Sequence, residues 1–109
     1  MIDLINKATK LQDKLNFAIK ELRQRGIDKA RTEADYRIAL AKKMLLERNA
    51  GMPVTIIGDI CRGDEKIAEL KMERDIAEAL YESCKQAIYA TKLEINIVMD
   101  YMKSERQGV

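Results

Sequence analysis

Apolar residues in the second half of the chain recur at alternating intervals of three and four positions. The series begins at Ile67, ends at Met102 and is interrupted by neither proline nor glycine. Its members are Ile67, Leu70, Arg74, Ala77, Tyr81, Cys84, Ile88, Thr91, Ile95, Val98 and Met102. This spacing is typical of a helix that packs against a second helix in a left-handed supercoil. The pattern predicts a helix over about residues 64–105, with Asp64 as its N-cap.

The first half of the chain carries a similar stripe with one interruption. Before the interruption its members are Leu4, Ala8, Leu11, Leu15, Ala18 and Leu22. Gly26 occupies the position of the next large residue, and the spacing resumes one step later. The members after it are Ile27, Ala30, Ala34, Ile38, Ala41 and Leu45. The pattern predicts a helix over about residues 2–49 that either passes Gly26 with a shift of register or bends there.

Residues 50–63 connect the two predicted helices and differ from them in composition. Gly51 suits a left-handed helix C-cap, and Pro53 prevents the helix from resuming. The β-branched run Val54–Ile57 favours an extended segment. Such a segment covers the end of the helices, pairs as a strand with its copy in another subunit, or docks onto a partner protein. The candidate partner-binding residues are Val54, Ile56 and Ile57.

Both predicted helices carry a second apolar set, which a simple hairpin leaves uncovered. These residues are Ile5, Phe17, Ile19, Tyr36, Leu40 and Leu46 in the first helix and Ile76, Leu80, Ala87, Ala90, Ile97 and Tyr101 in the second. We therefore predict an all-α, single-domain fold over residues 1–109, a long antiparallel helical hairpin of coiled-coil type with an extended apolar connection. Its copies are expected to associate, most simply as a homodimer that forms a four-helix bundle. The alternative is a three-helix monomer whose first helix breaks at Gly26.

Arg74 is the charged member of the second stripe. In a hairpin that turns near residue 55, Arg74 faces the region of Glu33, Tyr36 and Arg37. Because a guanidinium stays charged, it needs a carboxylate or access to water, and Glu33 is the expected partner. We expect these four residues to form a polar network that fixes the helix register, in preference to a ligand or catalytic site.

Composition narrows the possible functions further. The chain has 47% hydrophobic and 35% charged residues and no histidine. Because histidine is the commonest general base and transition-metal ligand, we expect no enzymatic activity, no catalytic residues, no cofactor and no metal site. Cys61 and Cys84 show no pairing pattern and are expected to be reduced thiols. With no signal peptide and no apolar run that could span a membrane, a cytoplasmic location is expected.

Charge is distributed unevenly between the two halves. Residues 1–50 hold 12 Lys and Arg against 7 Asp and Glu, a net charge of +5, and residues 51–109 hold 8 against 11, a net charge of −3. The strongest basic cluster, the candidate nucleic-acid-binding set, consists of Lys20, Arg23, Arg25, Lys29 and Arg31. Such a cluster can follow a phosphate backbone. No aromatic residue interleaves it and no nucleic-acid-binding motif is present, and basic stripes of this size are usually a solvated helix face.

Four segments together resemble small helical proteins that temperate phages and prophages of Gram-positive bacteria encode. They are RQRG (23–26), EADYRIALAKKMLLER (33–48), GMPVTIIGDICRGD (51–64) and ERDIAEALYESC (73–84). The likeness spans about residues 22–93. Such proteins are often encoded among genes for DNA replication and recombination. The resemblance therefore implies an accessory role near DNA in the cytoplasm of the bacterial host.

Two functions are expected from these observations. The first is a non-enzymatic, self-associating helical scaffold or adaptor, and the alternative is an accessory DNA-binding protein of phage replication or recombination. The first predicts association that is insensitive to salt and depends on Val54, Ile56 and Ile57. The second predicts DNA affinity that falls steeply with salt and weakens when Arg23 and Arg25 are replaced.

Overall fold

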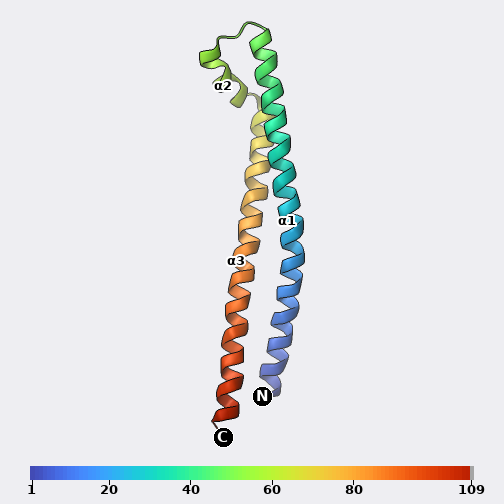
Figure 1. Ribbon diagram of the computed structural model, residues 1–109, viewed down its shortest axis with the longest axis vertical. Coiled ribbons are helices and arrows are strands. Elements are labelled where there is room, and N and C mark those ends of the chain that lie inside the picture. Colours follow the sequence, from blue (N-terminus) through green and yellow to red (C-terminus); the bar gives the residue numbers. More distant parts are fainter. Residues whose placement is uncertain (109) are drawn as a thin grey trace. The chain divides into compact units, whose positions relative to one another are not determined.

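The computed structural model describes residues 1–108, which form three α-helices and no β-strand (Figure 1). The helices are α1 (Ile2–Asn49), α2 (Val54–Arg62) and α3 (Glu65–Gln107). The predicted all-α helical hairpin is confirmed, whereas its association into a dimer stays a prediction. The chain divides into two compact units, which are described separately. We call residues 25–80 the central unit and the remaining described residues, 1–24 and 81–108, the terminal unit.

In the terminal unit, the first part of α1 lies antiparallel to the last part of α3 (Figure 1). The buried apolar side chains are Leu11, Leu15, Ile88 and Val98. Thr91 is buried among them, and its hydroxyl donates a hydrogen bond of 2.8 Å to the carbonyl oxygen of Ala87. The Cys84 thiol donates to the carbonyl oxygen of Ala18 at 3.4 Å. Both polar groups thus have acceptors, which removes the cost of burying them.

In the central unit, α1 from Arg25 onward packs with α2 and with α3 up to Leu80. The buried side chains are Tyr36, Cys61, Ile67 and Ala77. Lys43 lies 3.0 Å from the Glu47 carboxylate and 3.8 Å from that of Asp64, which joins α1 to the start of α3. The Asp64 carboxylate also accepts the backbone N–H of Ile67 at 3.2 Å. The predicted N-cap is therefore confirmed.

The end of α1 closes as a Schellman motif around Gly51. Its φ of 90° lies in the left-handed region, which glycine adopts without strain. The N–H of Gly51 donates to the carbonyl of Arg48, and the N–H of Met52 donates to that of Glu47. These two bonds satisfy carbonyls that the helix end leaves without partners. The predicted end of α1 is therefore confirmed. Pro53 follows, with φ −57° and ψ 135°, and is the N-cap of α2, so the prediction that it prevents a helix from resuming is wrong.

The connection differs from the prediction, because Val54–Ile57 begins the helix α2 and is not extended. The predictions of an extended connection and of strand pairing at residues 53–57 are therefore wrong. A β-branched residue disfavours a helix by only a few tenths of a kcal/mol. A helix satisfies its own backbone hydrogen bonds, whereas a lone strand here has no neighbour. Helical spacing also places Ile57 and Cys61 on one face and buries Cys61 completely.

Gly26 does not break α1, which is continuous through it. The alternative of a three-helix monomer with a break at this residue is therefore wrong. Gly26 is half-buried. Since α1 passes it as regular helix, the glycine does not act as a hinge.

Candidate functional site

An apolar stripe on α1 lies at the surface of the central unit. It consists of Ile27, Ala30, Ala34, Ile38, Ala41 and Leu45, all exposed, and is called the α1 face below. Ile27, Ile38 and Leu45 expose 49%, 55% and 60% of their surface. The six positions follow the helix repeat of about 3.6 residues, so they form one straight row. Single exposed apolar residues are common on protein surfaces, whereas an aligned row of them is not.

The sequence pattern suggested that this stripe contacts the second helix, and that interpretation is wrong. In the central unit, Tyr36 is buried and Leu40 is half-buried. Lys29, Glu33 and Lys43 are half-buried at the same 3–4 spacing. These inward positions continue the register of the N-terminal stripe without a shift at Gly26. Long polar side chains pack their aliphatic stems against neighbours and keep their charged groups near water or a partner. The inward side of α1 therefore contains charged residues, and a pattern of apolar residues alone does not identify it.

The exposed charges of α1 in the central unit are mainly basic. They are Arg31, Arg37, Lys42 and Arg48, with Asp35 as the exposed acid. The α1 face is therefore an apolar row with basic edges, which favours a partner with acidic edges.

A second apolar row lies on α3 in the same unit. Met72, Ile76 and Leu80 recur every four residues and are all exposed, and we call them the α3 face. The exposed charges along this part of α3 are mainly acidic. They are Glu65, Glu69, Glu73, Asp75 and Glu78, against Lys66 and Lys71. The two apolar faces of the central unit thus carry opposite charge at their edges.

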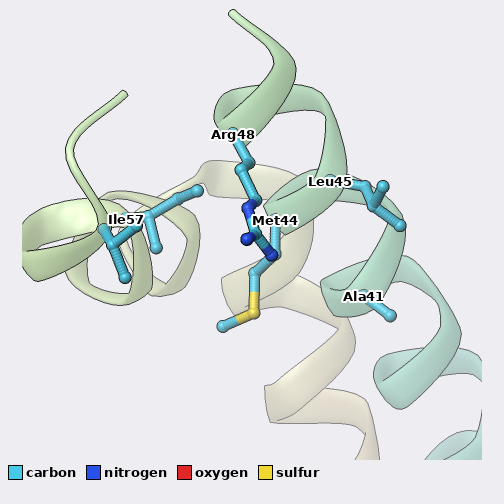
Figure 2. Close-up of a pocket in the computed structure, with 6 residues that line it drawn as sticks. Ala41, Met44, Leu45, Arg48 and Ile57 are labelled. Atoms are coloured by element: carbon cyan, nitrogen blue, oxygen red, sulfur yellow. The ribbon is translucent and has the colours of Figure 1, made fainter. Parts of the chain in front are cut away.

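A pocket of about 370 Å³ lies between α1 and α2 (Figure 2). Its lining residues are Ala41, Met44, Leu45, Arg48, Val54 and Ile57. Figure 2 shows the Arg48 side chain lying beside Met44. Because Ala41 and Leu45 also belong to the α1 face, the pocket continues that face toward α2. Apolar lining with a single charged residue suits an apolar side chain next to an acidic group.

The structure places the three predicted partner-binding residues on two sides of α2. Val54 and Ile57 line the pocket. Ile56 is exposed and is not among its lining residues. Successive residues of a helix project about 100° apart, so neighbours in sequence do not share a face. An extended segment would have separated them differently, with Val54 and Ile56 on one side.

The four residues of the predicted polar network lie together in the central unit. The Arg74 guanidinium lies 3.4 Å from the Glu33 carboxylate and 4.6 Å from the centre of the Tyr36 ring. Arg37 donates a hydrogen bond of 2.6 Å to Glu33. The network also includes Asp75, whose carboxylate accepts two hydrogen bonds from Arg74 that were not predicted. The pairing of residues adjacent in sequence depends on side-chain rotamers, for which the helix pattern gives no signal.

The pKa shifts of Arg74 and Asp75 are typical of ion pairs that stabilise a structure. The hydrogen bond to Asp75 raises the pKa of Arg74, and the carboxylates of Asp75 and Glu33 act in the same direction. Hydrogen bonds from Lys71 and then Arg74 lower the pKa of Asp75. Each group is therefore held in its charged form. A general acid or base needs a pKa near the working pH, so the network is suited to fixing the register of α1 against α3.

The five residues of the predicted basic cluster are divided between the two units. Lys20 and Arg23 are exposed in the terminal unit, and Arg31 is exposed in the central unit. Arg25 and Lys29 are half-buried, and each makes an interaction within the protein. Two positions along a helix differ by about 200°, so Arg31 and Lys29 project to nearly opposite sides. The central-unit members thus fail to line one path for a phosphate backbone.

Within residues 1–108, no three or more cysteine or carboxylate side chains are grouped so that they could hold a metal ion. None of the described helices combines the length and apolar character needed to cross a membrane. Comparisons of the chain with protein-family models, with curated proteins and with solved structures gave no match.

Proposed function

We propose that the chain is a non-enzymatic helical scaffold or adaptor that associates with further copies of itself. The observation that carries the proposal is the α1 face, a row of six exposed apolar residues on one side of a helix. A helix with one apolar row buries it against its neighbour in the hairpin, and α1 already does so through Tyr36 and Leu40. The additional row requires another surface to cover it.

The composition of the α1 face suits another α-helix as its partner. Ala30, Ala34 and Ala41 leave gaps between the larger side chains, so a second helix can approach closely and place its ridge of side chains in them. The chain itself offers such a helix, because α3 carries its own exposed apolar row. Self-association covers both rows without any further protein.

Measuring the molar mass by size-exclusion chromatography with light scattering tests this proposal. We expect the unmodified chain to exceed its monomer mass of 12.5 kDa and the double variant Ile38→Gln, Leu45→Gln to elute as a monomer. Phe17→Gln is the matched control, since Phe17 is 69% exposed but lies in the terminal unit. Its mass should equal that of the unmodified chain. If the double variant has the same molar mass as the unmodified chain, the α1 face does not mediate the association.

An accessory role at DNA, as the resemblance to phage-encoded proteins implies, is the second candidate function. The observation in its favour is that Lys20 and Arg23 are both exposed, one helical turn apart on α1. Fluorescence anisotropy of labelled single- and double-stranded DNA at low and near-physiological salt tests it. Binding that weakens several-fold in Arg23→Gln and not in Lys92→Gln, a variant at another exposed lysine, supports this function. Absence of binding at both salt concentrations excludes it.

A further inference from the structure

We infer that copies associate head to tail, with the α1 face of one copy packed on the α3 face of the next. This inference rests on the proposed self-association and names the two surfaces that meet. It commits to a second copy of this chain as the occupant of the α1 face. Three features of the central unit lead to it, namely charge, shape and the direction of the two faces.

Charge at the edges selects the pairing of unlike faces. The α1 face is bordered by the exposed basic residues Arg31, Arg37, Lys42 and Arg48. The exposed acids that share the side of the α3 face are Glu65, Glu69 and Glu73, whereas Glu78 projects to the opposite side of α3 and Asp75 is paired with Lys71 and Arg74. Two α1 faces in contact would bring basic edges together, and two α3 faces would bring acidic edges together. An α1 face on an α3 face brings opposite charges together. Such edge charges contribute mainly to the choice and orientation of the partner, while the apolar rows supply the affinity.

The shapes of the two rows also complement each other. The α1 face has small residues between its large ones, whereas the α3 face consists of Met72, Ile76 and Leu80. Small positions opposite large ones allow two helices to interdigitate. The pocket beside Ala41 and Leu45 extends the α1 face (Figure 2). In the assembly it would take up one apolar side chain of the neighbouring copy, and Arg48 in its lining would pair with an acidic residue beside that side chain.

The direction of the two faces determines the kind of assembly. Within the central unit, Tyr36 and Arg74 lie on the sides of α1 and α3 that face each other. The apolar faces are on the exposed sides of the two helices, so one neighbouring copy cannot cover both. A contact between two different surfaces leaves an unused α1 face at one end and an unused α3 face at the other. Such a contact is heterologous and continues beyond a dimer.

Two single variants, each blocking one face, test the inference. Ile38→Glu places a charge in the α1 face and Ile76→Glu places one in the α3 face, at residues 55% and 51% exposed, so the fold should persist. Circular dichroism checks that both keep the helicity of the unmodified chain. Each variant alone should be monomeric, because every copy lacks the same face. An equimolar mixture supplies one intact face of each kind and should give a 1:1 dimer, twice 12.5 kDa, with nothing larger.

The alternatives give different masses in light scattering. If Ile76→Glu alone assembles like the unmodified chain, the contact does not use the α3 face and the head-to-tail inference is wrong. Monomeric single variants whose mixture stays monomeric also overturn it. In both of those cases the unmodified chain still exceeds its monomer mass and self-association stands. An unmodified chain that is monomeric at every concentration overturns the proposed function itself.

Discussion

Arg74 shows how one charged residue is accommodated in an apolar seam. Its side chain is 23% exposed, and it has two carboxylate partners and an aromatic ring within reach. Glu33, the partner across the helices, is also held by Arg37 at 2.6 Å. Removing Arg74 would therefore not leave an uncompensated charge in the seam. This is the condition under which losing an ion pair is tolerated.

Replacing Arg74 with leucine is expected to preserve the fold. A leucine restores the apolar character of the seam and removes one partly screened ion pair, so the free energy of unfolding should change by less than about 1 kcal/mol. Urea denaturation followed by circular dichroism measures the change. Arg23→Leu, at an exposed position of α1 in the terminal unit, is the control for adding a surface leucine. A loss of several kcal/mol in Arg74→Leu would show that the network is required for folding.

Asp75 is expected to titrate below its usual pKa of 3.8, chiefly because Lys71 donates a hydrogen bond of 3.1 Å to its carboxylate. A lowered pKa in the folded state stabilises the fold above pH 3.8, and this contribution is lost as the pH falls through the lower value. NMR titration of the Asp75 carboxyl carbon should show the Lys71→Met variant moving toward 3.8. Lys92→Met, at a distant lysine, should leave it unchanged. If Lys71→Met leaves the pKa of Asp75 unchanged, the hydrogen bond from Lys71 is not what lowers that pKa.

At the scale of elements, the two long helices were predictable because their local signals agree. Apolar spacing, the absence of proline within α1 and α3, and end signals at Gly51 and Asp64 all indicate the same boundaries. The helix α2 was not predictable from propensity, because its β-branched residues favour a strand that has no partner here. Backbone hydrogen bonding and the burial of Cys61 outweighed that preference.

Two glycines of the connection, Gly51 and Gly58, should respond in opposite ways to alanine. Gly51→Ala forces a Cβ into the left-handed region and should lower the free energy of unfolding by about 1 kcal/mol. Gly58 lies within α2, where alanine reduces the conformational entropy of the unfolded chain, so Gly58→Ala should raise the free energy of unfolding by about 0.4–1 kcal/mol. The added Cβ is tolerated because it meets only the flexible end of the Arg62 side chain. Thermal unfolding compares the two. Equal effects would contradict the turn geometry described for α1.

The helical form of the connection changes which of its residues should matter for association. Val54 and Ile57 line the pocket that extends the α1 face, whereas Ile56 does not. Val54→Ser together with Ile57→Ser should weaken self-association several-fold, and Ile56→Ser should leave it near that of the unmodified chain. Sedimentation velocity over a range of concentrations measures both. A stronger effect of Ile56→Ser would indicate that the outer side of α2 makes the contact.

For the whole molecule, the sequence indicated that more apolar surface exists than one hairpin can bury. It did not show which row faces outward. Ile27, Ile38 and Leu45 looked like seam residues because they are apolar and regularly spaced, while the true inward positions include Lys29 and Lys43. Only the position of α3 beside α1 separates the two rows. The α1 face was therefore identified from the exposure of its residues and not from the sequence pattern.

The central claim is that the exposed α1 face drives copies of this chain to associate. Sedimentation equilibrium of the unmodified chain, over at least a hundredfold range of concentration, tests it most directly. We expect an average mass that exceeds the monomer's 12.5 kDa and continues to rise past that of a dimer. A mass that stays at 12.5 kDa throughout would contradict self-association. A plateau at twice that value would retain self-association and contradict head-to-tail growth.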